Sequence, residues 1–360
     1  MIYNLQVLRA IAAILVFFYH SEIYWKDALP STWLFSLGLA GVDIFFVLSG
    51  FIMAATTTSR DTTATSFLSH RIFRIAPLYW IITLVFTFLF FSGFKPVGVT
   101  ELTPEYLIKS LLFIPFLRGG AAEPIVTVGW TLNYEIFFYL VFSLCLLIPS
   151  MRARHPAVIT LIMIALLPSI FGSNNFYAIY YGNPIMLEFC FGIVCYHCLT
   201  WVEKTFVPNR ITPFAAAAFL IMSLLFFFAP AFGLFGAGAT FHSSTFIRPF
   251  TWGVAGFFAV LAAVTLERSK HVWRRFGLVE IGNASYSIYL IHGLMLHGAS
   301  KVAKILSSDP LTFALVTTIG ALVLSIAAGL IMFRYLEAPI NKFLRGFFTR
   351  FLAKPSPSTG

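Results

Sequence analysis

Long apolar runs, separated by short polar segments, make up most of this 360-residue chain. Ten of the runs have roughly the 17–25 residues that a helix needs to cross the hydrocarbon core of a bilayer. They cover residues 5–24, 36–55, 76–94, 129–149, 156–172, 184–201, 213–232, 250–267, 283–299 and 311–335. Because lipid cannot bond to exposed backbone groups, each run is predicted to be an α-helix. The pattern therefore predicts an all-α polytopic membrane protein with about ten transmembrane helices.

The polar segments between the runs are short, with one exception at residues 95–128. Its apolar stretch at 105–117 is too short to span a bilayer comfortably, so a re-entrant or interfacial segment is predicted there. No soluble domain interrupts the runs, and we expect a single membrane domain over residues 1–350. Residues 351–360 contain a short stretch rich in Pro and Ser and are predicted to form a disordered tail.

The composition agrees with this pattern. Apolar residues account for 59% of the chain and charged residues for 11%, whereas a soluble domain carries about 25% charged residues. The formal net charge of +10 would fit nucleic-acid binding, but the basic residues lie in short loops and form no basic domain. We therefore expect membrane lipids, and no nucleic acid, around the chain. Cys195 and Cys198 lack the second cysteine pair that a zinc site needs, so no metal is expected.

The basic residues in the loops indicate how the helices are oriented. With a cytoplasmic N-terminus, ten spans place sixteen Lys and Arg residues on the cytoplasmic side and seven on the outer side, with Arg9 inside the first span. Cytoplasmic loops of membrane proteins carry such an excess of Lys and Arg. The bias predicts that both the N-terminus and the C-terminus are cytoplasmic and that residues 95–128 lie outside.

Six ionisable side chains lie inside predicted spans, where each is a candidate functional group because a charge is costly in lipid. They are Arg9, His20, Asp43, Glu135, Glu188 and His292. At about 1.5 Å of rise per residue, four of them fall at similar depths on four different helices: His20, Asp43, Glu135 and His292. We expect these four to cluster, because clustering would let them satisfy one another. For Glu188, near the end of its span, an interfacial position is the alternative.

Arg9 and His20 lie eleven residues apart in the first predicted helix. Eleven steps of about 100° make three turns plus roughly 20°, so both side chains share one helix face about 16 Å apart. The alternatives are a snorkelling Arg9 that only fixes orientation and a His20 that only packs.

A histidine beside a carboxylate is a general base with a fixed tautomer. In this role His20 would take the proton from a hydroxyl group that attacks a thioester. It would equally serve as a covalent carrier by accepting the acyl group itself. Both routes remain open at the level of the sequence.

Arg71 and Arg74 lie just before Pro77, on the predicted cytoplasmic side. Two arginines three residues apart share a helix face. Their guanidinium groups suit bidentate hydrogen bonds to phosphates, as a nucleotide-bearing donor needs. The alternative is that both are orientation charges.

Six segments in order along the chain carry further information. They are Leu8–His20 with its basic-x10-His spacing, Gly41–Phe51, Arg71–Tyr79, Gly129–Tyr139, Ser285–His292 and Tyr335–Pro339. Together these segments resemble the motifs of the acyltransferase 3 family of membrane acyltransferases, and the resemblance covers nearly the whole chain. Within that family, this short chain is similar to exopolysaccharide O-acetyltransferases of rhizobial type.

The resemblance implies a multi-pass enzyme of the cell inner (plasma) membrane. It implies acyl-coenzyme A, usually acetyl-CoA, as the cytoplasmic donor. It implies a hydroxyl group of an exopolysaccharide, another surface glycan or a lipid-linked glycan as the acceptor. The main alternative is a transporter or flippase for such a glycan, in which the buried charges mark a substrate or proton path. The absence of an internal sequence repeat argues against a transporter.

The resemblance also implies roles for particular residues. His20 would be catalytic, with Asp43 and Glu135 supporting it. The basic residues expected to serve the donor are Arg9, Arg71 and Arg74. The residues expected to support the substrate or the site are Trp130, Ser285, Tyr286 and His292.

The orientation can be tested by cysteine labelling in a variant without the four native cysteines. A cysteine that replaces Lys270 should stay unlabelled by an impermeant reagent in intact cells, because its segment is predicted to be cytoplasmic. It should become labelled once the membrane is opened. A cysteine that replaces Lys26, on the predicted outer side, is the control and should be labelled in both conditions. Labelling at position 270 in intact cells would contradict the ten-span arrangement.

Overall fold

A computed structural model describes residues 2–58, 62–93, 101–118, 120–205, 212–232, 246–273 and 277–352. Within these ranges the chain is helical and contains no β-strand beyond one isolated bridge. The longer helices are α1 (Tyr3–Ser21), α3 (Ala40–Thr56), α4 (Ala64–Phe91), α6 (Trp130–Cys145), α7 (Met151–Ile170), α9 (Leu187–Thr205), α10 (Thr212–Phe228), α11 (Val254–Arg268), α13 (Ser285–Leu306), α14 (Pro310–Met332) and α15 (Ala338–Leu352). The shorter ones are α2 (Trp33–Ser36), α5 (Pro104–Leu111), α8 (Phe176–Tyr181) and α12 (Leu278–Asn283).

Eight helical stretches in the described ranges are long and apolar enough to cross a membrane, and each corresponds to one of the ten predicted runs. The all-α polytopic fold class is thereby confirmed. The other two predicted runs are helices as well. One is α10, which has 17 residues, and the other is α13, whose 22 residues include two histidines and two lysines.

The fourth helix begins twelve residues before the predicted start of its run, so that boundary was wrong. Thr63 caps it, because its hydroxyl accepts a hydrogen bond from the Ser66 N–H (3.2 Å). The first turns of α4 are polar, so the apolar run did not include them. Because α4 begins at Ala64, Arg71 and Arg74 are part of this helix. At the other terminus, α15 continues to Leu352, and the rest of the predicted tail lies outside the described residues.

Part of the long segment 95–128 returns to the bundle. Its helix α5 has only eight residues, too few to span a bilayer. Beyond α5, the side chains of Phe113, Ile125 and Val126 are buried in the main core. Residues 94–100 and Gly119 lie outside the described ranges.

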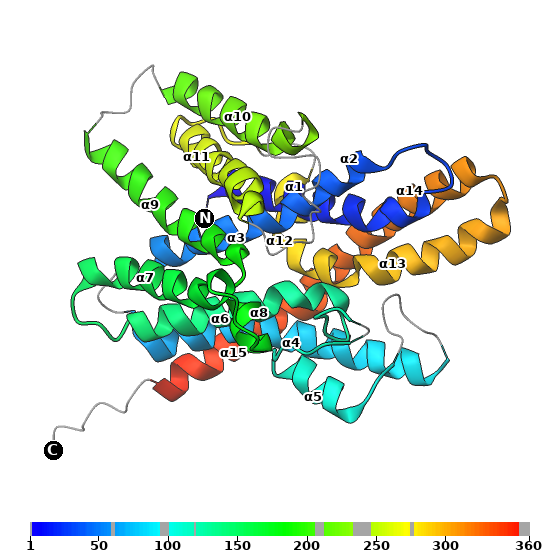
Figure 1. The fold of residues 1–360 in the computed structure, drawn as a ribbon, viewed down its shortest axis with the longest axis horizontal. Coiled ribbons are helices and arrows are strands. Elements are labelled where there is room, and N and C mark those ends of the chain that lie inside the picture. Colours follow the sequence, from blue (N-terminus) through cyan, green and yellow to red (C-terminus); the bar gives the residue numbers. More distant parts are fainter. Residues whose placement is uncertain are drawn as a thin grey trace.

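Hydrogen bonds between remote segments define one end of the bundle. The Asn4 side chain donates to the carbonyl oxygens of Ala263 (3.2 Å) and His271 (2.9 Å). The backbone N–H groups of Tyr3 and Asn4 donate to the Glu267 carboxylate. We call this the amino end and the opposite end, where α1 terminates, the His20 end. Figure 1 shows the α13–α14 hairpin extending toward the His20 end, and α1 packs against α3, α11, α12 and α13.

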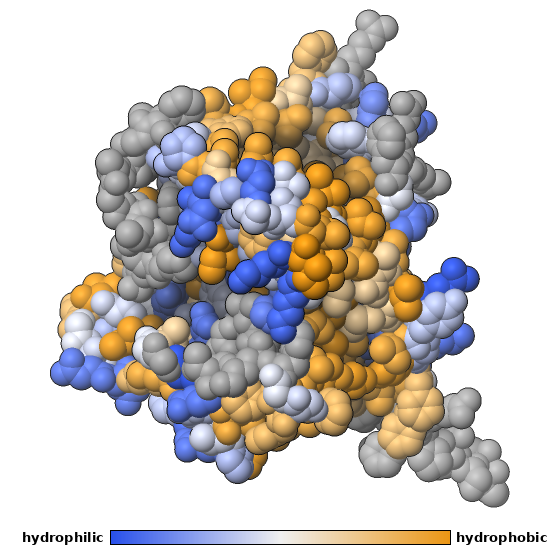
Figure 2. Space-filling model, turned by 90° about the vertical axis from the view of Figure 1, so that its right-hand side faces the viewer, coloured by the Kyte–Doolittle hydropathy of each residue, from blue (hydrophilic) through white to orange (hydrophobic). Residues whose placement is uncertain are grey.

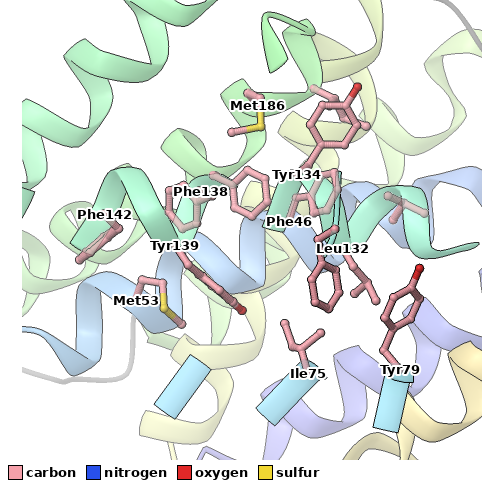
Figure 3. Close-up of a cluster of buried hydrophobic side chains, with 14 of the residues drawn as sticks. Phe46, Met53, Ile75, Tyr79, Leu132, Tyr134, Phe138, Tyr139, Phe142 and Met186 are labelled. Atoms are coloured by element: carbon pink, nitrogen blue, oxygen red, sulfur yellow. The ribbon is translucent and has the colours of Figure 1, made fainter. Parts of the chain in front are cut away.

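Glycine residues let the central helices approach closely. A Cβ atom on Gly50 of α3 would lie 2.0 Å from the Phe189 carbonyl oxygen of α9, and one on Gly192 would lie 2.1 Å from the Val47 carbonyl oxygen. Small residues drive such contacts in membranes, where the hydrophobic effect does not bring helices together. Beside this contact, Phe46 stacks on Phe189 with ring centroids 4.5 Å apart. Figure 3 shows Phe46 among the aromatic side chains of α6, and the resulting rigid core supports the cavities beside it.

Candidate active site

Helix α1 brings its two predicted functional residues to two different cavities. Arg9 lines a cavity in the middle of the bundle, which we call the central pocket. His20 lines a larger cleft, which we call the His20 cleft. The predicted shared face of α1 therefore runs alongside both cavities.

The central pocket joins charged and hydroxyl groups within mostly apolar walls. Its polar lining consists of Arg9, Ser49, Arg74, Thr131, Glu135, Tyr139, Ser285, Tyr286 and Tyr289. The Glu135 carboxylate accepts hydrogen bonds from the Tyr139 hydroxyl and from the Ser49 hydroxyl (3.3 Å). This arrangement brings one carboxylate and two guanidinium groups to the walls of one mostly apolar pocket, where charges interact more strongly than in water.

Two predicted support residues also line the central pocket. The Tyr286 hydroxyl donates to the Ile75 carbonyl oxygen (2.7 Å) and so ties α13 to α4. The Ser285 hydroxyl is buried and has no hydrogen-bond partner in the described part of the chain. A buried group of this kind is available to a ligand that enters the pocket.

The His20 cleft lies at the His20 end and has several aromatic residues in its walls. Its lining includes Tyr19, His20, Glu123, Trp130, Tyr134, Phe176, Tyr180, Asn183 and Arg248. Figure 2, which views the molecule from this end, shows hydrophilic residues near the middle of the face with apolar residues beside them to the right. An aromatic cleft with a few polar groups is suited to a small organic substrate.

Val42 and Tyr289 line both the central pocket and the His20 cleft. The Tyr289 hydroxyl donates to the Val128 carbonyl oxygen (2.9 Å), and this bond holds its ring in place. The two cavities are thus neighbours that share walls. Tyr289 and Val42 therefore separate the pocket of Arg9 from the cleft of His20.

His20 lies beside His292, as the predicted depths suggested. Their ring centroids are 5.0 Å apart, and both residues line a third cavity, which we call the histidine cavity. His292 is only 2% exposed. Its Nδ1 atom lies 2.7 Å from the Tyr289 carbonyl oxygen.

The two predicted carboxylates bond to groups other than the histidines. Asp43 forms a buried bidentate ion pair with Arg248, with Nε–Oδ1 at 3.0 Å and Nη2–Oδ2 at 2.9 Å. Glu135 faces the central pocket. The expectation of one four-membered cluster was therefore wrong, because equal depth does not determine which way each helix faces.

Sequence reasoning missed Arg248 and misjudged Glu188. Arg248 lies just before a predicted apolar run and looked like a loop charge. Glu188 is fully buried against Asp43, so the interfacial alternative was wrong. The signal that was overlooked is a single arginine between apolar residues, since such a charge needs a buried partner.

Arg71 and Arg74 line two different cavities, although they are one turn apart on α4. Arg74 lines the central pocket. Arg71 lines a separate, polar cavity that we call the amino-end pocket, together with His70 and Arg345. The Arg71 side chain donates to the Thr56 hydroxyl (3.1 Å). Arg345 comes from α15, and no sequence motif had pointed to it.

A metal centre finds no support in the described part of the chain, where no three His, Cys, Asp or Glu side chains come together as ligands. His155 and His197 do form a pair, with ring nitrogens 2.9 Å apart.

The sequence is similar to known proteins over most of its length. A family described as "Acyltransferase domain" matches residues 2–330. The exopolysaccharide production protein ExoZ of Rhizobium meliloti (strain 1021) is 31% identical over 312 residues, which cover 85% of this chain and 90% of that protein. Nodulation protein 10 of Rhizobium leguminosarum bv. viciae is 27% identical over 318 residues, or 82% and 83% of the two chains.

A more distant relative is the O-acetyltransferase OatA of Staphylococcus aureus (strain NCTC 8325 / PS 47). It is 24% identical over 321 residues, which cover 80% of this chain and 49% of that protein. No solved structure matches the chain.

The buried ion pair gives a test of the site's architecture. Asp43→Asn should destabilise the folded protein by about 3 kcal/mol, because it leaves the Arg248 guanidinium without its counter-charge. Glu188→Gln, the matched control, keeps the ion pair and the side-chain volume and should cost less than about 1 kcal/mol. Thermal unfolding in detergent would measure both. Equal destabilisation by the two substitutions would contradict the role given to the Asp43–Arg248 pair.

Proposed function

This chain belongs to the acyltransferase family, as its motifs predicted, and we propose that it O-acetylates a surface glycan of the cell. In this proposal the donor is cytoplasmic acetyl-CoA and the acceptor is a hydroxyl group of an exopolysaccharide or of a lipid-linked glycan. The printed names of the relatives, which include exopolysaccharide production and O-acetyltransferase, support this choice. Family membership favours an enzyme over the transporter or flippase alternative.

The observation that carries the proposal is the order of the cavities along the bundle. The amino-end pocket contains Arg71 and Arg345, the central pocket contains Arg9 and Arg74, and the His20 cleft lies beyond. Four arginines therefore line the two cavities toward the amino end, whereas the arginine of the His20 cleft, Arg248, is paired with Asp43 beside the candidate base. A donor that has phosphates at one end and a thioester at the other matches this order.

The amino-end pocket suits the phosphates of coenzyme A. Arg71 and Arg345 supply two guanidinium groups from α4 and α15, and Thr56 and Ser66 supply hydroxyl groups. Charge-assisted hydrogen bonds of this kind bind phosphates strongly. The face of the protein with this pocket would be cytoplasmic, in agreement with the bias of the basic loops.

The central pocket suits the thin pantetheine arm. Its apolar walls would hold the chain of the arm, while Arg9 and Arg74 offer donors to its amide carbonyls or to a phosphate. Arg9 and His20 lie about 16 Å apart along α1 by the helical rise. An arm that passes between Val42 and Tyr289 would bring the thioester close to His20.

The acceptor would enter the His20 cleft from the opposite side. There the acceptor oxygen attacks the thioester carbonyl carbon while His20 takes the hydroxyl proton. A C–O bond forms, the C–S bond breaks, and the proton passes on to the leaving thiolate of coenzyme A. The acetyl group would thus cross the membrane although coenzyme A does not. An acetyl group found covalently attached to His20 would instead identify the carrier route.

The donor site can be tested by binding measurements on purified protein. Arg71→Ala and Arg345→Ala should each weaken acetyl-CoA binding by about 10- to 100-fold, the effect of one lost charge-assisted hydrogen bond. Arg152→Ala is the control, because Arg152 is an exposed residue at the start of α7 and does not line the amino-end pocket. Equal dissociation constants in all three variants would contradict phosphate binding by Arg71 and Arg345 and would leave them as charges that only fix the orientation of the helices.

The catalytic role of His20 is tested by two substitutions. His20→Ala should lower glycan acetylation by about 10²–10⁴-fold, the usual contribution of a general base. His20→Gln retains some hydrogen bonding but should be equally inactive, because an amide is not a base at neutral pH. Mass spectrometry of the glycan would report acetylation, and acetyl-CoA binding would show that both variants are folded. Acetylation by His20→Gln at the wild-type rate would contradict the catalytic role and show that His20 only packs.

A further inference from the structure

His292 is held in one tautomer by its own helix. Its Nδ1 atom lies 2.7 Å from the Tyr289 carbonyl oxygen, an atom that only accepts hydrogen bonds. Nδ1 must therefore carry the proton, and in a neutral imidazole the lone pair then lies on Nε2. A neutral ring is expected here because His292 is buried, and a buried cation without a counter-charge is costly.

The Nε2 atom of His292 is buried and has no hydrogen-bond partner in the described part of the chain. Buried acceptors are normally paired, so an orphaned one points to a partner that binds only in another state of the protein. The cavity beside it is lined by His292 and His20. His20 also lines the cleft assigned to the acceptor, so it borders both cavities.

The spacing of the two rings is that of a hydrogen-bonded pair. The centroids of His20 and His292 are 5.0 Å apart with an interplanar angle of 45°. The rings of His155 and His197 have the same 5.0 Å centroid distance and share a hydrogen bond of 2.9 Å between their nitrogens. The two rings are thus close enough for an N–H of His20 to reach Nε2 when the His20 ring turns toward His292.

We propose that His292 is a positioning residue for His20, on the premise that His20 is the general base of the proposed function. Nε2 of His292 accepts a hydrogen bond from one N–H of His20, which leaves the other nitrogen of His20 facing the acceptor hydroxyl. When His20 takes the hydroxyl proton, its ring becomes an imidazolium that still donates to His292. The proton stays on His20 until the thiolate of coenzyme A receives it, and His292 remains neutral throughout.

A neutral histidine suits this position better than the carboxylate that orients many catalytic histidines. The carboxylates Asp43 and Glu135 bond elsewhere, to Arg248 and to Tyr139. A carboxylate at position 292 would be a buried charge needing its own partner. The imidazole supplies the acceptor atom without that cost.

Three substitutions at position 292 separate this role from others. The side-chain oxygen of His292→Gln reaches about as far as Nε2, whereas that of His292→Asn reaches only as far as Nδ1. His292→Leu fills the space with no acceptor. The assay follows thiol release from acetyl-CoA by the purified full chain with methyl β-D-glucopyranoside as the acceptor, and gives kcat and the KM for acetyl-CoA.

We expect His292→Leu and His292→Asn to lower kcat by about 10- to 100-fold, the rate equivalent of one lost hydrogen bond to a catalytic group. The KM for acetyl-CoA should be unchanged, and His292→Gln should recover at least half of the wild-type kcat. If His292 were needed only for folding, the substitutions would lower the amount of active protein, and kcat per active molecule would not differ between the Gln variant and the other two.

Two results would overturn the proposal. One is a His292→Gln variant that binds acetyl-CoA normally but is as slow as His292→Leu, because His292 would then act as a base itself. The other is a kcat near the wild-type value in all three variants. Failure of the wild-type protein to release thiol would refute the proposed function instead. If His292→Leu does not fold, the comparison of Gln with Asn alone decides.

Discussion

Polar side chains inside this bundle have to find partners within the protein, because lipid around the helices offers none. That constraint explains the contacts that hold the functional region together. Asp43 neutralises Arg248 across α3 and the segment before α11, and Ser287 of α13 donates to the Glu337 carboxylate (2.6 Å). The polar groups that stay without a partner in the described part of the chain include Ser285 and His292, both of which line cavities.

The same constraint makes α1 the axis of the proposed chemistry. A charged donor cannot enter lipid, so its charges need arginines at one end and its thioester needs an enclosed path to the base. Arg9 and His20 on one helix face mark two points of such a path, and the walls Val42 and Tyr289 mark the boundary between them. The close packing of α3 on α9 through Gly50 and Gly192 keeps that path in a fixed geometry.

The sequence predicted most of the fold, since an apolar run of sufficient length has only one stable form in a bilayer. It failed where polar residues belong to a helix, as in the first turns of α4. Prediction of the site was less complete. The motif spacing placed Arg9 and His20 on one face, but depth alone did not show that Asp43 faces Arg248 or that Glu135 faces the central pocket. Arg345 was missed because its partners are remote in sequence and meet only in the folded chain.

The central claim is that the acetyl group passes through the protein while coenzyme A stays on one side. Vesicles that contain the purified protein, with methyl β-D-glucopyranoside enclosed and acetyl-CoA labelled in its acetyl group added outside, test this directly. The account predicts labelled acetyl ester inside the vesicles and all free coenzyme A outside. Acetyl ester that forms only when donor and acceptor are on the same side of the membrane would contradict it.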